Sequence, residues 1–269
     1  MLTLNLGPLA LSLSHALLLG SLLLASLTGW WLGRRSARNP EGVLFLLLLI
    51  ALLVARIAFV ARYFDEYEQS PWQMLDVRDG GFLIWPGLLA ALLVAAGLAW
   101  RDRVLRKPLL GALAVGVLVW GGGQLVLRSL EQGTRLPELA LRDMDGQPVQ
   151  LHDYLGKPLV INLWATWCPP CRREMPVLAK AQAREKSVTF LIVNQGEGEA
   201  EIRRFLAHSG LELDNLLLDS GGRLGQQVGS RALPTTLFYD AQGRQVGSHL
   251  GELSQASLAR ALESLRPAP

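Results

Sequence analysis

The first 33 residues of this chain contain no Asp, Glu, Lys or Arg, and this run limits what the N-terminal half can fold into. Residues 9–33 alone would form a helix long enough to cross a hydrocarbon layer about 30 Å thick. A cleaved secretory signal would begin with a basic segment, which residues 1–13 lack. Further apolar runs of similar length lie at residues 43–63, 81–100 and 108–127. We therefore expect residues 1–130 to form an all-α domain of four transmembrane helices in the lipid bilayer.

The charged residues separate this half from the remainder. Residues 1–130 carry 11 Lys and Arg and 7 Asp and Glu, whereas residues 131–269 carry 15 and 16. The basic residues of the first half lie in short clusters between apolar runs and form no basic face on a soluble domain, so no nucleic acid partner is expected. Two Cys are too few for a disulfide-stapled scaffold. Residues 131–269 are expected to form a separate soluble domain.

The predicted loops differ in charge, and Lys and Arg are retained on the cytoplasmic side of a membrane during insertion. The first and third loops hold seven basic residues, Arg34, Arg35, Arg38, Arg101, Arg103, Arg106 and Lys107. The middle loop, residues 65–80, holds Arg78 as its single basic residue. The first and third loops are therefore expected in the cytoplasm. Residues 131–269 then lie on the periplasmic side of a bacterial inner membrane.

Arg56 interrupts the second apolar run, where a charged side chain is costly. Two interpretations are open. Arg56 faces a partner or a wet cavity inside the helix bundle, or it extends toward the outer interface beside Arg62 and Asp65.

Three segments of this half carry a family resemblance: Leu6-Gly7-Pro8-Leu9, residues 55–60 (ARIAFV) and residues 79–88 (DGGFLIWPGL). Together they resemble the N-terminal part of prolipoprotein diacylglyceryl transferase. In that family the last segment carries an essential His before a Gly-Gly pair, and this chain has Trp85-Pro86-Gly87 there. The resemblance thus implies a degenerate relative that serves as an anchor or docking surface. A related lipid transferase stays as an alternative.

The second half alternates strand-like and helix-like segments after a connector at residues 131–138. A turn signal at residues 143–146 predicts an opening hairpin, and the apolar, β-branched run at residues 158–164 predicts a strand buried on both faces. The further predicted elements are a helix to about residue 186, a strand at 188–194, helices at 199–208 and 222–228, a strand pair at 235–239 and 245–250, and a last helix at 254–265. This order predicts an α/β fold, with helices flanking a mixed sheet.

The motif Cys168-Pro169-Pro170-Cys171 carries the chemistry of this domain. Two intervening residues place both sulfurs in the first turn of a helix, where backbone N–H groups stabilise the thiolate of Cys168. Cys168 is therefore the expected attacking, exposed sulfur, and Cys171 the resolving one. A metal half-site would need a further Cys or His pair, and neither His152, His208 nor His249 has ligand spacing, so we expect no metal. A static structural disulfide is the remaining alternative, and no cofactor beyond a redox-active Cys168–Cys171 disulfide is expected.

The segment around these cysteines, residues 161–176 (INLWATWCPPCRREMP), resembles the thioredoxin superfamily, specifically the TlpA/ResA-like extracytoplasmic thiol-disulfide oxidoreductases. The similarity extends from about residue 136 to 265 and implies a thioredoxin fold. It also implies a cis-Pro loop at Leu233-Pro234 that faces the cysteines and pairs with an extended substrate segment. Trp167 is expected at the rim of the substrate site, and Trp164 in the core.

Two neighbours are expected to tune the reaction. Asn162 stands where thioredoxin has a buried Asp and cannot accept a proton. Glu174 matches an acid that ResA-like proteins place near their cysteines, which implies a proton acceptor for Cys171. The alternative for Glu174 is an ordinary solvated helix residue.

The resemblance implies a reductant of disulfides in envelope client proteins, for example in cytochrome c maturation. Because Pro169 lacks an N–H, it weakens thiolate stabilisation, which favours the reductant over a thiol oxidase. A peroxiredoxin would have Thr at position 165, which is Ala. A membrane scaffold with a vestigial redox domain is a further alternative. The apolar segments contain no Cys, so a reductant would need a separate membrane thiol-disulfide electron donor.

Overall fold

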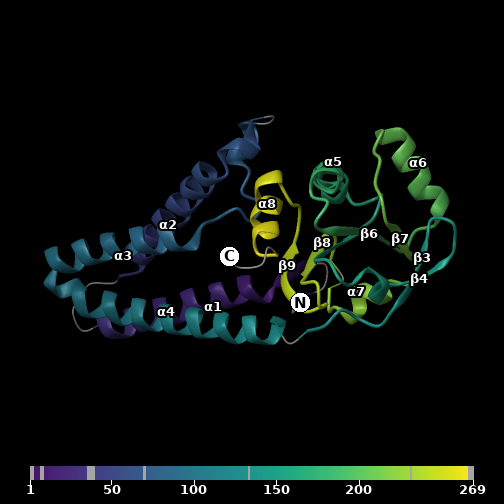
Figure 1. Cartoon of the computed structure of the whole chain (residues 1–269). Helices are drawn as coiled ribbons and strands as arrows, with labels where there is room; N and C mark the ends of the chain where they lie inside the picture. Colours follow the sequence, from purple (N-terminus) through teal and green to yellow (C-terminus); the bar gives the residue numbers. More distant parts are fainter. Residues whose placement is uncertain are drawn as a thin grey trace. The chain divides into compact units, whose positions relative to one another are not determined.

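The computed structural model describes residues 3–6, 9–34, 40–68, 71–132, 134–230 and 232–265 (Figure 1). The chain divides into two compact units. One spans Leu13–Arg128, and the other combines Met1–Ser12 with Ser129–Pro269.

The first unit is helical. Its helices are α1 (Leu13–Gly33), α2 (Glu41–Arg62), α3 (Ile84–Arg101) and α4 (Arg103–Gln132). In the described part of the chain, these four helices are long and apolar enough to cross a membrane. Small side chains, among them Ala25, Ala95, Ala99 and Ala112, are buried between the helices, while many Leu and Trp side chains face outward. This distribution suits helices that pack closely within lipid.

The boundaries of the four predicted helices differ from those in the structure, most of all at the start of the first and of the fourth. Residues 9–12, expected in the first helix, form β2 (Leu9–Ser12), which pairs antiparallel with β1 (Thr3–Leu6). The third predicted loop shrinks to Asp102, whose carboxylate accepts the N–H groups of Val104 and Leu105. Arg103, Arg106 and Lys107 therefore lie in α4, because charged residues are good helix formers once the N-terminus is capped. Arg35 and Arg38, like Gly7 and Pro8 of the resemblance, lie outside the described residues.

Arg56 fastens the connection between α2 and α3, which contains the short 3₁₀ helices η1 (Phe64–Tyr67) and η2 (Pro71–Leu75). Its guanidinium donates to the Asp79 carboxylate at 2.9 Å. It also donates to the backbone carbonyls of Gln73, Met74, Asp76 and Gly81. Arg56 is 8% exposed and paired with Asp79, so it faces a partner, and that partner lies in the connection between α2 and α3.

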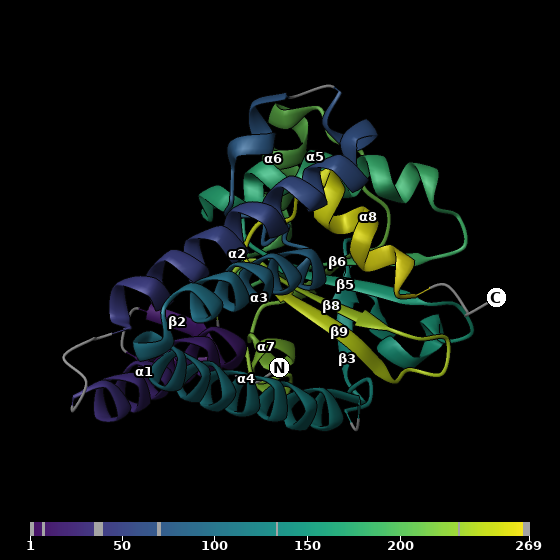
Figure 2. The same cartoon turned by 90° about the vertical axis from the view of Figure 1, so that its left-hand side faces the viewer.

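The second unit contains a seven-stranded mixed sheet of order β4-β3-β7-β6-β5-β8-β9. Its strands are β3 (Ala140–Asp143), β4 (Pro148–Gln150), β5 (Leu159–Trp164), β6 (Thr189–Gln195), β7 (Leu216–Asp219), β8 (Thr235–Tyr239) and β9 (Gln245–Leu250). The helices are α5 (Pro169–Arg184), α6 (Glu199–Ser209) and α8 (Gln255–Glu263) on one face of the sheet, and α7 (Arg223–Gln227) on the other (Figures 1 and 2). The α/β thioredoxin fold expected from the sequence is confirmed.

Successive side chains of β5 point to opposite faces of the sheet, so this strand contributes to the apolar cluster on each face and to the site. Val160 and Trp164 point into the apolar cluster under α5, α6 and α8, while Ile161 and Leu163 point into the cluster on the opposite face. Trp164 is fully buried, as expected, and its ring lies 5.3 Å from that of Phe205. Asn162 shares the face of Val160 and Trp164, so its polar side chain points toward α5.

Strand β7 was not predicted. Its four residues pair in parallel with β6, as in Ile192↔Leu216, and two of them pair antiparallel with β3, as in Arg142↔Leu218. The short sequence Leu216–Asp219 has no alternating pattern, so pairing with two neighbouring strands decides its conformation.

Candidate active site

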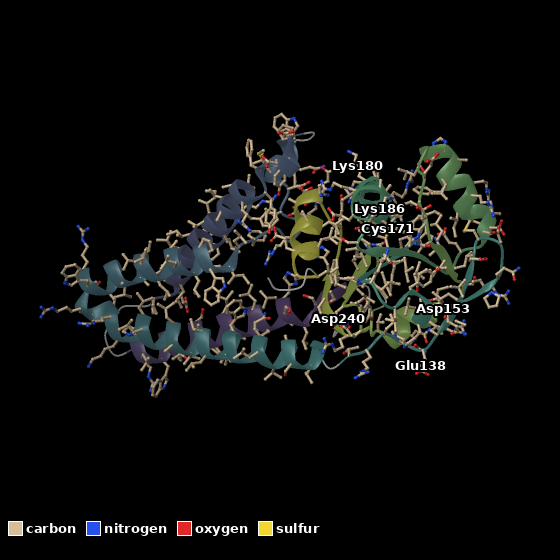
Figure 3. The ribbon with its side chains drawn as sticks, in the orientation of Figure 1. Glu138, Asp153, Cys171, Lys180, Lys186 and Asp240 are labelled. Carbon is tan, nitrogen blue, oxygen red and sulfur yellow. A yellow bond between two sulfur atoms is a disulfide. The ribbon has the colours of Figure 1, made fainter. Side chains whose placement is uncertain are left out.

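The two cysteines meet where β5 gives way to α5. Cys168 is the N-cap residue of α5 and forms a disulfide with Cys171, with an S–S distance of 2.12 Å (Figure 3 labels Cys171 on this helix). Pro169 and Pro170 occupy the first two helical positions, where the missing N–H groups leave no helical hydrogen bond unmade. The first helical N–H is that of Cys171, which donates to Sγ of Cys168 at 3.3 Å.

The expectation that Cys168 is exposed is not met in this disulfide form. Cys168 is 2% exposed and Cys171 is fully buried, because both belong to the apolar cluster beneath α5. Pro169 is exposed, Pro170 is half-buried, and Trp167 is 67% exposed, so Trp167 and Pro169 border the small accessible edge of Cys168. Trp167 lies on the surface next to Cys168.

Glu174 lies one turn into α5 and is fully buried, unlike its exposed neighbours Arg172 and Arg173. The interpretation of Glu174 as a solvated helix residue is therefore wrong. Its two carboxylate oxygens accept hydrogen bonds from Asn162 Nδ2 at 2.8 Å and from the N–H of Leu253 at 3.0 Å. Burial raises the pKa of Glu174, and the two hydrogen bonds lower it. Burial is the larger effect, so the pKa is about 8.

Asn162 links this carboxyl to the next strand. Its Nδ2 also donates to Thr236 Oγ1 at 3.0 Å, and the two residues lie opposite each other on β5 and β8. The Leu233–Pro234 peptide bond, just before β8, is cis. Leu233 packs against both apolar clusters of the domain, one of which contains the two cysteines. Arg231, at the start of this loop, lies outside the described residues.

Glu197 supports the site and was not singled out in the sequence. Its carboxylate accepts the backbone N–H of Thr166 at 2.6 Å and the Thr166 hydroxyl. It also accepts from Asn194 Nδ2 at 2.7 Å. Glu197 follows β6, and the carboxyl ends of neighbouring parallel strands meet at one edge of a sheet, so its place next to the β5–α5 turn was open to prediction.

No group of three or more His, Cys, Asp or Glu residues that would hold a metal ion occurs within the ranges that the structure describes. His152 and His208 are exposed, and His249 Nε2 lies 3.2 Å from the carbonyl oxygen of Glu252. In the first unit, Trp85 is 80% exposed on α3, at the position where the transferase resemblance implies a His.

Both halves match known families. Residues 131–263 match the redoxin family, and residues 5–128 match the prolipoprotein diacylglyceryl transferase family. The thiol-disulfide oxidoreductase ResA of Halalkalibacterium halodurans is 32% identical over 143 residues, which cover 52% of this chain and 81% of the relative. ResA of Geobacillus kaustophilus is 29% identical over 168 residues, which cover 61% and 96%.

Solved structures resemble about half of the chain. A putative thiol:disulfide interchange protein DsbE from Chlorobium tepidum is 26% identical, with a TM-score of 0.46, and covers 50% of this chain and 98% of its own. The exposed lipoprotein thioredoxin Etrx1 from Streptococcus pneumoniae is 29% identical, with a TM-score of 0.41, and covers 48% and 100%.

A thioredoxin fold with a Cys-Pro-Pro-Cys disulfide at a helix N-terminus defines a thiol-disulfide oxidoreductase. The chain belongs to the ResA-like family of these enzymes, and its residues 5–128 are similar to prolipoprotein diacylglyceryl transferase. It is a membrane protein that carries a redox domain.

Proposed function

We propose that this protein reduces disulfides in envelope proteins, with cytochrome c maturation as one such process. In this proposal four helices anchor the chain in the bacterial inner membrane, and the domain of residues 131–269 lies on the periplasmic side. The observation that carries the proposal is the Cys168–Cys171 pair at the start of α5, with the buried carboxyl of Glu174 one turn away.

The reaction follows from the order of the two sulfurs. In the reduced enzyme, the Cys168 thiolate attacks one sulfur of a client disulfide, the client S–S bond breaks, and a client thiolate leaves. The Cys171 thiolate then attacks Sγ of Cys168 and releases the second client thiolate. Two electrons and two protons pass from the Cys168–Cys171 dithiol to the client, and the disulfide seen in this structure is the product.

Glu174 is the proposed proton acceptor for Cys171. Both groups are buried on α5, one helical turn apart, so water is a poor competitor for the proton. A carboxyl with a pKa of about 8 lies close to the ordinary range of a thiol, which suits transfer in either direction. Asn162 holds the Glu174 carboxylate from β5, and Leu233 and Pro234 provide the backbone beside which the client segment lies.

The helix start favours the reducing direction. A thiol oxidase of this fold is a strong oxidant when the thiolate of its attacking cysteine is strongly stabilised. Here the first two helical residues are Pro169 and Pro170, so two N–H groups that would face Cys168 are missing, and the one N–H that reaches Sγ is that of Cys171. A weakly stabilised thiolate makes the dithiol a better electron donor.

Trapping of clients tests the order of attack. Cys171→Ser in the full chain should accumulate mixed disulfides between Cys168 and client proteins, because the resolving sulfur is gone. Cys168→Ser should accumulate almost none. Both variants are compared on non-reducing gels after acid quenching, and equal trapping by the two would refute the assigned order.

The direction is tested by the redox state in cells. Cys168 and Cys171 are the two Cys of the whole sequence, so no thiol relay through the apolar helices is available and electrons must come from a separate membrane thiol-disulfide donor. Alkylation should find the pair largely reduced in cells with such a donor and oxidised in cells without it. Dependence on an envelope oxidase instead would establish the thiol oxidase alternative.

The orientation has its own test. A C-terminal alkaline phosphatase fusion should be active, because this reporter folds outside the cytoplasm. Activity of a cytoplasmic reporter at the same position would overturn the topology.

A further inference from the structure

A groove runs between α5 and α6 on the surface of the redox domain. Its α5 side consists of Pro169, Arg172, Arg173 and Pro176, and its α6 side includes Phe205 and the following Leu211. The groove has a volume of about 350 Å³, within the range of pockets that hold small ligands or side chains. We name it the α5–α6 groove.

The α5–α6 groove combines apolar walls with the guanidinium of Arg172. Pro169, Pro176 and Phe205 supply apolar surface, and the Arg172 guanidinium lies 5.9 Å from the centroid of the Phe205 ring. Arg173 is held away by an ion pair with Glu252 at 2.6 Å. Arg172 has no carboxylate partner among the residues that the structure describes. Its positive charge is therefore available to a bound group.

The position of the groove connects it with the reaction. Pro169 stands between the two cysteines, so the groove begins at the reactive disulfide and continues down α5. When a client is bonded to Cys168, its chain continues in both directions from the client cysteine. Both continuations must cross the surface of the redox domain next to Cys168. One direction leads over the exposed Trp167, and the other leads over Pro169 into the groove.

We propose that the α5–α6 groove is a recognition site for the client, which binds an apolar side chain and an adjacent Asp or Glu close to the client's reactive cysteine. The apolar residue would lie against Pro176 and Phe205, and the carboxylate would pair with Arg172. A basic client segment would face an uncompensated like charge and bind less well. This proposal rests on the proposed function and specifies its substrate class.

The test uses short peptides in which a cysteine is held in a mixed disulfide with a chromophoric thiol. Four peptides are compared, which are identical except for a dipeptide placed two to four residues from the cysteine. This dipeptide is Leu-Glu, Leu-Lys, Ser-Glu or Gly-Ser. The full chain, reduced and held in detergent micelles, is mixed with each peptide for a single turnover, and release of the thiol gives the second-order rate constant. We expect the Leu-Glu peptide to react about two- to fivefold faster than the Leu-Lys peptide at low salt, the range of an exposed ion pair. The preference should decline at high salt.

Two variants locate the preference. Arg172→Glu should reverse the ratio of Leu-Glu to Leu-Lys, and the ratio cancels any effect on Cys168 itself. Ser209→Trp places a large ring from the end of α6 into the groove and should reduce the advantage of the Leu peptides over Ser-Glu and Gly-Ser. Arg204→Glu is the matched control: Arg204 precedes Phe205 on α6, pairs with Glu201 and does not line the groove. It should keep the wild-type ratio.

The outcomes separate this inference from the proposed function. If no peptide is reduced, the proposed reductase activity fails. If all four peptides are reduced at equal rates, or if Arg204→Glu changes the ratio as much as Arg172→Glu, the enzyme is active but the groove is not a recognition site.

Discussion

Replacing Glu174 by Gln tests the proton acceptor most directly. The substitution keeps the size of the side chain and removes its ability to take a proton from Cys171. Positioned acid–base groups contribute roughly 10²- to 10⁴-fold to a rate. We therefore expect the mixed disulfide on Cys168 to be resolved about 100-fold more slowly in Glu174→Gln at pH 8.

The pH dependence follows from the raised pKa of Glu174, about 8. With that pKa, about 9% of the carboxyl is ionised at pH 7 and about 50% at pH 8. Both proteins keep Cys168 and Cys171, so the ratio of wild-type to Glu174→Gln rates isolates the contribution of the carboxyl. This ratio should rise about fivefold from pH 7 to pH 8. Glu252, from the loop before α8, also faces Glu174 and adds to the rise in its pKa, while Arg173 pairs with Glu252.

The assay prepares the mixed disulfide with a peptide thiol in the full chain and follows its decay by rapid quenching and mass spectrometry. Glu212→Gln, which changes an exposed carboxylate after α6, is the control and should match the wild type. A ratio near one, or a ratio that does not change with pH, would refute the assignment of Glu174 as the acceptor.

The remaining predictions concern stability, each followed by thermal unfolding in detergent micelles. The pKa of Glu174 is raised from 4.5 to about 8, so the folded protein is harder to ionise at this residue than the unfolded chain. The free energy of unfolding should therefore fall as the pH rises from about 4.5 through 8, by at most about 5 kcal/mol. Glu174→Gln should remove this fall. Arg56→Met removes the guanidinium that pairs with the buried Asp79 carboxylate and should cost about 3–5 kcal/mol and expose residues 64–68 and 71–81 to protease, while Arg62→Met should do neither. Gly87→Val places a Cβ 2.3 Å from the carbonyl oxygen of Ala51 and should cost about 1–3 kcal/mol, whereas Gly97→Val, with open space around it, is the control. Equal effects of either pair would contradict the packing described here.

The sequence by itself determined the division into an apolar and a soluble half. Charge and hydropathy depend on residue type alone, so they are known without the fold. It also determined the strands β5, β6 and β8, whose β-branched and apolar runs suit a doubly covered sheet. The Cys-Pro-Pro-Cys motif placed the disulfide at a helix start, since two intervening residues fit one turn.

Tertiary structure decided what depends on distant neighbours. The resemblance implied a proton acceptor at Glu174, and a solvated residue like Arg172 and Arg173 was the alternative. Burial, with hydrogen bonds from Asn162 and Leu253, makes Glu174 a carboxyl with a high pKa. Strand β7 exists because two strands pair with it.

Arg56 shows the same dependence. The sequence left two interpretations open because a single charge in an apolar run has no visible partner. Its acceptors are a carboxylate and four carbonyls that lie 17 to 25 residues further along the chain, and the folded α2–α3 connection brings them to one guanidinium. The sequence around a charged residue in an apolar run shows that this residue needs a partner. Only the folded backbone shows which groups it meets.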